Sequence, residues 1–152
     1  MSKNSKLCYL IFSYLFFIAF DIFFSNLILN SLRFNFKQNA FIDLIFVQNE
    51  GAAFSILENA KVFLILFSIL AIISIFGYIV KNINKFSLFV SYWVAMLLAG
   101  ISCNLYERIT LGYVRDFFKL NFVDFPVFNI SDIFINLAVI ALIIIIIKNR
   151  WK

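Results

Sequence analysis

The stretch VFLILFSILAIISIFGYIV, residues 62–80, carries no charged side chain, and it decides the class of fold. An α-helix needs about 17 to 25 mainly apolar residues to cross the hydrocarbon core of a bilayer, so this stretch is long enough for one span. Three further apolar stretches have similar lengths, at residues 7–29, 86–106 and 130–147. We therefore expect an integral membrane protein with a core of four transmembrane helices.

The composition supports this class. Hydrophobic residues make up 64% of the 152 residues and the mean hydropathy is +0.99, whereas soluble domains contain about 45 to 50% apolar residues. The stretch at 7–29 is interrupted only by Asp21. It is longer than the core of a secretory signal and lacks a small-residue cleavage site, so we expect a retained helix. No repeat or linker divides the sequence, and residues 1–152 are expected to form a single domain.

The distribution of charge predicts the topology. If both termini face the cytoplasm, that side carries cations without any acidic residue, as short cytoplasmic loops usually do. The cations are Lys3, Lys6, Lys81, Lys85, Lys148, Arg150 and Lys152. The net charge of +5 is then explained by topology and by contact with membrane lipids. Nucleic-acid binding is not expected, because the basic residues form no patch interleaved with aromatic residues.

This topology leaves two sizeable segments outside the membrane, residues 30–61 and 107–129. Both contain patterns rich in β-branched and aromatic residues, FIDLIFVQN at 41–49 and GYVRDFFKLNFVDF at 112–125. Such patterns favour short strands. We expect them to pair into a small extracytoplasmic sheet that carries the functional residues.

Several catalytic classes are excluded by missing residue types. The chain has no His, which removes Ser-His and Cys-His pairs and the HExxH zinc site. No glycine-rich phosphate loop is present. A Ser-Lys pair with Lys61 or Lys119 as the base remains formally possible, although no Ser-containing motif indicates it. A pair of carboxylates is the other option, and it needs neither a metal nor a cofactor.

Acidic residues gather in VRDFFKLNFVDFPVFNISD, residues 114–132. Two carboxylates in one site share a proton, so that one can act as a base and the other as an acid. Asp132 follows the good N-cap residues Asn129 and Ser131 and is expected in the first turn of a helix, where it could equally serve only as a cap. Asp116 could be a solvated charge paired with Arg108 or Arg115, and Asp124 is interpreted as a solvated loop charge.

Four motifs resemble those of lipoprotein signal peptidases (signal peptidase II), the bacterial membrane aspartic proteases that process lipid-modified prolipoproteins. The family's N-x-G-A-A-F is matched by NEGAAF at 49–54, and its G-N-L-x-D-R by CNLYER at 103–108. Its G-x-V-x-D-F is matched by GYVRDF at 112–117, and its F-P-x-F-N-x-A-D by FPVFNISD at 125–132. The motifs occur in the family's order and the resemblance covers nearly the whole chain.

The resemblance implies that Asp116 and Asp132 are the catalytic pair. Other matched residues are expected to bind the substrate or to hold local backbone groups, namely Asn49, Gly51, Asn104, Arg108 and Asn129. No metal is implied.

The chain departs from the family pattern at four positions. Glu107 replaces an Asp, so a pairing with Arg108 would have to adjust. Cys103 replaces a Gly and Ser131 an Ala. In the first helix Ser25 occupies the place of a Lys, which leaves Asp21 without its expected partner.

The sequence therefore predicts an aspartic endopeptidase in the bacterial cytoplasmic membrane with its active site near the outer leaflet. The resemblance implies a prolipoprotein substrate that is cut on the amino side of a diacylglyceryl-cysteine. A transporter would also place acids in a membrane, but the stretches at 62–80 and 86–106 are uncharged. A non-catalytic scaffold would leave NEGAAF and the two aspartates unexplained.

Overall fold

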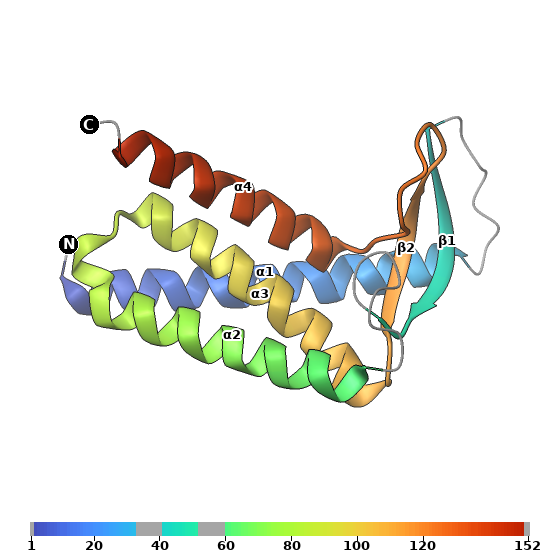
Figure 1. Ribbon diagram of the computed structural model, residues 1–152, viewed down its shortest axis with the longest axis horizontal. Helices are drawn as coiled ribbons and strands as arrows, with labels where there is room; N and C mark the ends of the chain where they lie inside the picture. Colours follow the sequence, from blue (N-terminus) through green and yellow to red (C-terminus); the bar gives the residue numbers. More distant parts are fainter. Residues whose placement is uncertain (1, 33–40, 52–59, 151–152) are drawn as a thin grey trace.

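The structure is a computed structural model that describes residues 2–32, 41–51 and 60–150. In these ranges the chain forms four long helices and a two-stranded sheet (Figure 1). The helices are α1 (Lys3–Leu32), α2 (Lys61–Asn82), α3 (Leu88–Thr110) and α4 (Ile130–Arg150). A short 3-10 helix, η2 (Ile83–Lys85), connects α2 to α3, and the strands are β1 (Ile42–Asn49) and β2 (Val114–Leu120).

All four helices are long and apolar enough to cross a membrane. Helices α1 and α2 extend beyond the apolar stretches from which they were predicted at both ends, and α4 does so at its C-terminal end. Helix α3 instead begins at Leu88, two residues later than expected, and continues to Thr110. The expected fold class, four membrane helices with a small sheet, is confirmed.

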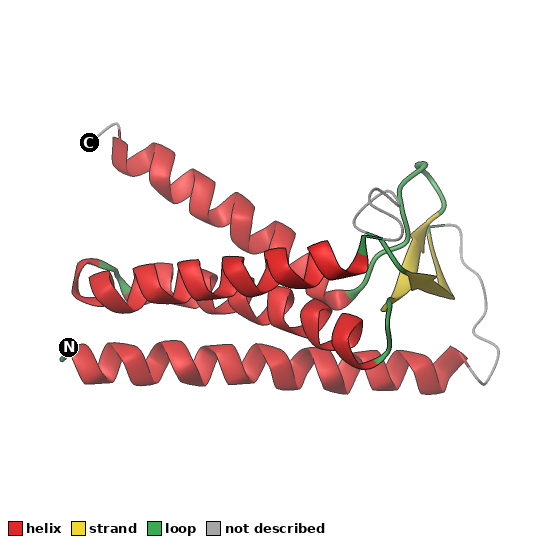
Figure 2. Cartoon of the chain, turned by 60° about the horizontal axis from the view of Figure 1, so that its bottom comes forward, coloured by secondary structure: helices red, strands yellow, loops and turns green. Residues whose placement is uncertain are grey.

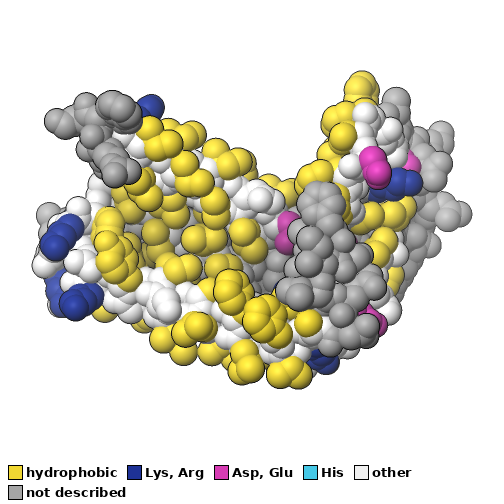
Figure 3. Space-filling view, in the orientation of Figure 1, with side chains coloured by type: hydrophobic (Ala, Val, Ile, Leu, Met, Phe, Trp, Pro, Cys, Tyr) yellow, Lys and Arg dark blue, Asp and Glu magenta, His cyan; other side chains and the backbone are white. Residues whose placement is uncertain are grey.

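The helices lie side by side with both termini at one end of the bundle and the sheet at the other (Figures 1 and 2). Lys and Arg side chains gather at the terminal end, whereas acidic side chains appear toward the sheet (Figure 3). The end that carries the sheet is therefore chemically distinct from the end that carries the termini.

Helix α3 lies at the centre of the bundle. One buried cluster joins it to α1 and α2 through Leu10, Ile79, Ile83, Val94, Ala95 and Leu98. A second cluster joins it to α1 and α4 through Phe17, Met96, Ala99, Ile130, Phe134 and Ala138. Ala95 and Ala99 are fully buried, and small residues of this kind let membrane helices approach closely.

The outward faces of the helices remain apolar. Phe12 and Leu66 are 72% and 61% exposed, and many other large hydrophobic side chains on all four helices are exposed in the same way. They cover much of the helical surface seen in Figure 3. In a membrane these side chains contact lipid, which explains why the sequence is so much more apolar than a soluble domain.

The sheet consists of β1 and β2 paired antiparallel, with Ile42 opposite Leu120 and Asn49 opposite Val114. The register is irregular between Leu44 and Val47. Since residues 121–125 form no strand, β2 ends earlier than the pattern at 112–125 suggested. The chain then returns toward the bundle, and Phe128 forms a bridge with Phe118 immediately before α4 begins.

Candidate active site

Asp116 lies on β2, opposite Val47 of β1, and only 1% of it is exposed. Its carboxylate accepts hydrogen bonds from Asn49 Nδ2 at 2.9 Å and from Asn129 Nδ2 at 3.0 Å. Burial raises the pKa of Asp116 to about 7, and the negative charge of Asp132 acts in the same direction. The suggestion that Asp116 is a solvated charge is therefore wrong.

Asp132 occupies the first turn of α4, where Asn129 caps the helix. The Asp132 backbone N–H donates to Asn129 Oδ1 at 2.8 Å, and the Asn129 backbone N–H donates to Asp132 Oδ2 at 3.1 Å. This reciprocal arrangement is a capping box, which satisfies two backbone donors that a helix start leaves free. Asp132 does act as a cap, as the simplest interpretation of the sequence suggested, but the cap occupies only one of its oxygens.

The other Asp132 oxygen faces α3. Asn104 Nδ2 donates to Asp132 Oδ1 at 2.9 Å, and Asn129 Nδ2 donates to Asn104 Oδ1 at 3.0 Å. Asn129 therefore bonds to Asp116 through its side chain and to Asp132 through its backbone. The structure brings the two aspartates into one hydrogen-bonded group with Asn49, Asn104 and Asn129.

A cavity of about 190 Å³ adjoins this group. Its polar lining comes from Asp132, Asn49, Asn104, Arg108 and Asn136. Its apolar lining comes from the start of β2, from the segment before α4 and from α4 itself, namely Val114, Phe125, Pro126, Val127, Phe128 and Ile135. Asp116 is not among the lining residues, but it bonds to Asn49, which lines the cavity.

Arg108 links α3 to the end of β1. Its guanidinium donates to the Gly51 carbonyl at 2.9 Å through one terminal nitrogen, and more weakly to the Asn104 carbonyl at 3.4 Å through the other. Its Nε atom is buried and has no hydrogen-bond partner within the described ranges. Gly51 itself is buried, and its N–H donates to Asn49 Oδ1 at 3.0 Å. Arg108 and Gly51 thus hold Asn49 beside Asp116, while residues 52–54 of NEGAAF lie outside the described residues.

Glu107 pairs with Arg115 rather than with Arg108. Its carboxylate accepts from Arg115 Nε at 2.8 Å and from the Arg115 backbone N–H at 2.7 Å, and a terminal guanidinium nitrogen completes an ion pair. This clamp fixes the start of β2 to the end of α3 next to Asp116. The sequence did not indicate this ion pair, because the position of Arg115 depends on the turn between α3 and β2. Gly112, with a φ of 94°, sets the geometry of that turn.

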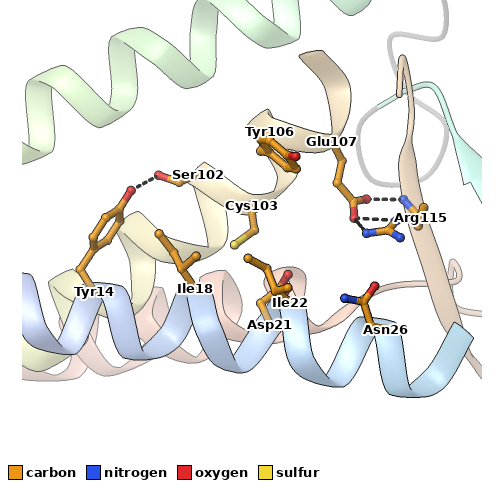
Figure 4. A pocket seen from close by; sticks show the side chains of 10 residues that line it. All are labelled: Tyr14, Ile18, Asp21, Ile22, Asn26, Ser102, Cys103, Tyr106, Glu107 and Arg115. Atoms are coloured by element: carbon orange, nitrogen blue, oxygen red, sulfur yellow. Dashed lines mark hydrogen bonds and ion pairs between the residues drawn. The ribbon is translucent and has the colours of Figure 1, made fainter. Parts of the chain in front are cut away.

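A larger cavity, of about 510 Å³, lies between α1 and α3 (Figure 4). Asp21 and Asn26 of α1 face Cys103 and Tyr106 of α3 across it, and the Glu107–Arg115 pair closes one end (Figure 4). Neither Asp116 nor Asp132 lines this cavity. The smaller cavity is the candidate active site, because Asp132 lines it and it adjoins the hydrogen-bonded group that contains both aspartates.

All seven residues that the sequence analysis put forward lie in or around the smaller cavity. The aspartates and the three asparagines form the hydrogen-bonded group, and Arg108 and Gly51 hold the adjoining strand end. Asp124, in contrast, is exposed on the loop after β2.

Known proteins resemble this chain over most of its length. The family described as signal peptidase (SPase) II matches residues 13–148. A lipoprotein signal peptidase of Streptococcus thermophilus is 40% identical over 109 residues, which are 72% of this chain and 68% of the relative. One from Enterococcus faecalis is 34% identical over 110 residues, again 72% and 68% of the two chains.

Two solved structures, both described as a bacterial membrane enzyme determined by the in meso method, share the fold. One has a TM-score of 0.81 with 27% identity and covers 93% of this chain and 88% of that chain. The other has a TM-score of 0.75 with 27% identity and covers 91% and 92%.

The fold, the site and these relatives define the protein as a multi-pass membrane protease. The chain belongs to the signal peptidase II family. The resemblance seen in the four sequence motifs is thereby confirmed.

Proposed function

We propose that the chain, acting as one peptidase domain over residues 1–152, is an aspartic endopeptidase that removes signal peptides from prolipoproteins, with Asp116 and Asp132 as its catalytic pair. Membership of the signal peptidase II family supports the reaction and the class of substrate. The observation that carries the assignment of the pair is the position of Asn129, which bonds to both carboxylates.

The two aspartates have different surroundings. Asp116 is buried and its pKa is raised to about 7, so it retains a proton near neutral pH. Asp132 accepts two N–H hydrogen bonds at the N-terminus of α4, and each of these interactions stabilises a carboxylate. We therefore assign the role of the acid to Asp116 and the role of the base to Asp132.

In the reaction, the ionised Asp132 removes a proton from a water molecule while the water oxygen attacks the carbonyl carbon of the scissile peptide bond. The protonated Asp116 donates its proton to the carbonyl oxygen, which forms a neutral tetrahedral intermediate. The intermediate collapses as the C–N bond breaks, and the leaving amine takes the proton that Asp132 acquired. Asp116 regains a proton from the intermediate's hydroxyl, so neither a covalent intermediate nor a cofactor is required.

The substrate we propose carries a diacylglyceryl-modified cysteine and is cut on the amino side of that cysteine. Phe125, Phe128 and Ile135 line the cavity beside Asp132, and the surface is hollowed between α4 and the sheet (Figure 3). These apolar groups allow acyl chains to remain in lipid near the site, where each buried CH₂ contributes about 0.8 kcal/mol.

The proposed location is the bacterial cytoplasmic membrane, with both termini in the cytoplasm and the active site near the outer leaflet. The Lys and Arg residues at the terminal end of the bundle, among them Lys6, Lys81 and Lys148, support this orientation through the positive-inside rule. The site lies at the opposite end, next to the sheet.

The proposal is tested with purified protein and a lipid-modified prolipoprotein. Asp116→Asn and Asp132→Asn keep the side-chain shape but cannot exchange a proton, so each should lower cleavage by at least about 10³-fold. Asp124→Asn is the matched control and should retain most activity, because Asp124 is exposed on the loop after β2. Turnover near the wild-type rate in either dyad variant would refute the catalytic assignment.

A further inference from the structure

Asp21, in the middle of α1, is a buried carboxylate that the proposed mechanism does not use. It is 6% exposed and accepts a hydrogen bond from the Ser131 hydroxyl at 2.7 Å. Ser131 is 2% exposed and directly precedes Asp132 in the first turn of α4. The bond therefore joins α1 to the turn that carries a catalytic residue, across a separation of 110 residues in the sequence.

The backbone of the same turn is fixed from another side. A Cβ atom on Gly100 of α3 would lie 2.7 Å from the Ser131 carbonyl oxygen and 3.3 Å from the Ile135 backbone nitrogen. Since Cβ atoms do not approach oxygen so closely, α4 packs directly on the glycine backbone of α3. Ser131 is thus held by α1 through its side chain and by α3 through its carbonyl.

These two contacts determine where the Asp132 carboxylate lies. Asp132 bonds to Asn104 on α3 and to Asn129 at the cap, and both bonds require the first turn of α4 to keep its rotation. Without the link to α1, the turn loses one of the contacts that fix its rotation, while its contact with Gly100 remains. A displacement of about 1 Å in a catalytic group can lower the rate by about 10²-fold.

The cost of burying the Asp21 carboxylate also favours a specific role for its hydrogen bond with Ser131. A carboxylate within a membrane helix is costly unless it is bonded, and Asp21 borders the larger cavity between α1 and α3 (Figure 4). The Ser131 hydroxyl supplies a short bond that fixes the carboxylate toward α4. Neither Asp21 nor Ser131 lines the cavity beside Asp132, so neither is placed to contact a substrate there.

We infer that Asp21 is a positioning residue for Asp132 and acts through the hydroxyl group of Ser131. The inference rests on the proposed catalytic pair and adds to it a residue from the first helix. Loss of the bond should lower kcat and leave KM nearly unchanged, because substrate contacts are retained while the base is misplaced.

Steady-state cleavage of a lipid-modified prolipoprotein by four single variants tests the inference. Ser131→Ala and Asp21→Leu each remove the bond and should lower kcat about tenfold with KM within about twofold of wild type. Asp21→Asn retains an oxygen acceptor and should keep most of the activity. Ser102→Ala is the matched control: it removes a different hydrogen bond of α1, from Tyr14 at 3.0 Å, and should not change kcat.

The double variant Asp21→Leu/Ser131→Ala separates positioning from general loss of stability. If the two residues act through one bond, its kcat should equal that of Asp21→Leu alone. Losses that multiply in the double variant, or a kcat of Ser131→Ala equal to wild type, would overturn the inference. So would equal losses of kcat in Ser131→Ala and Ser102→Ala. These outcomes differ from failure of the proposed function, which would appear as activity in Asp132→Asn.

Discussion

Replacing Asp116 by Asn should inactivate the protein and, at neutral and alkaline pH, make it more stable. The folded protein holds the Asp116 carboxyl in a buried site that raises its pKa from 3.8 to about 7. Ionisation there is opposed by burial first and by the charge of Asp132 as well. Asparagine has nearly the same shape and carries no charge, so the variant avoids this cost.

The size of the effect follows from the two pKa values and its sign from proton binding. Between pH 3.8 and about 7 the folded state holds a proton at Asp116 that the unfolded state has lost, so stability falls as pH rises. Each pKa unit corresponds to about 1.36 kcal/mol, which gives a cost on the order of 4 kcal/mol at pH 8 and about 1 kcal/mol at pH 4.5. Below pH 3.8 both states are protonated and the cost vanishes.

Asparagine also introduces a cost of its own. Asp116 accepts from the amides of Asn49 and Asn129, whereas an Asn side chain offers one oxygen and faces one of these amides with its own NH₂ group. An unsatisfied buried group costs about 1 to 3 kcal/mol at every pH. Only the cost of ionising a buried carboxyl depends on pH. The free energy of unfolding of the variant, relative to that of wild type, should therefore increase by about 3 kcal/mol between pH 4.5 and pH 8.

Thermal unfolding in detergent micelles, followed by tryptophan fluorescence at a series of pH values, measures this gain. A change of about 3 kcal/mol should shift the difference in Tm between variant and wild type by about 5 to 10 °C. Asp124→Asn, which removes an exposed carboxylate on the loop after β2, is the control. A difference in Tm for Asp116→Asn that does not change with pH would refute the argument that burial keeps this carboxyl protonated.

Three further predictions concern packing, proton transfer and topology. Gly100→Ala should destabilise the protein by about 1 to 3 kcal/mol and lower activity, because the added methyl group would collide with the α4 backbone. Gly77→Ala is the control and should be neutral or stabilising, because no atom lies within 4 Å of the added methyl group. Equal changes in Tm for both variants would contradict the packing argument. The rate of cleavage should be bell-shaped in pH, with its alkaline limb near 7 where Asp116 loses its proton, and a rate that rises to a plateau at high pH would favour a Ser-Lys site instead. Reporter fusions after Lys152 should report the cytoplasm and fusions near Leu120 the opposite side, and the reverse pattern would exclude processing at the outer leaflet.

The elements of the fold could be predicted from the sequence because a membrane imposes a simple requirement. A span must be apolar over its whole length, and the four apolar stretches therefore correspond to α1 to α4. The two strand-forming patterns were also found. Their antiparallel pairing places Asp116 opposite Val47. The capping residues Asn129 and Asp132 were recognisable because a helix start has its own local chemistry.

The contacts between helices could not be predicted in the same way. In a membrane the lipid-facing and the core-facing side chains are both apolar: Phe12 is 72% exposed while Phe17, five residues further along α1, is 4% exposed. Hydrophobicity therefore does not show which face of α1 packs inward, and the bond from Ser131 to Asp21 could not be inferred.

The Glu107–Arg115 clamp was missed for a related reason. Its partners lie on α3 and β2, and the turn between them decides which Arg the carboxylate meets. The neighbouring Arg108 bonds to backbone carbonyls instead.

The most direct test of the account is the mass of the product released from a lipid-modified prolipoprotein by the purified protein. Wild-type protein should yield a product that begins with the modified cysteine, and Asp132→Asn should yield none under the same conditions, although its Tm remains measurable and its fold intact. Cleavage at that bond by Asp132→Asn at the wild-type rate would contradict a catalytic pair formed by Asp116 and Asp132, and a wild-type product cut elsewhere would contradict the proposed cleavage site.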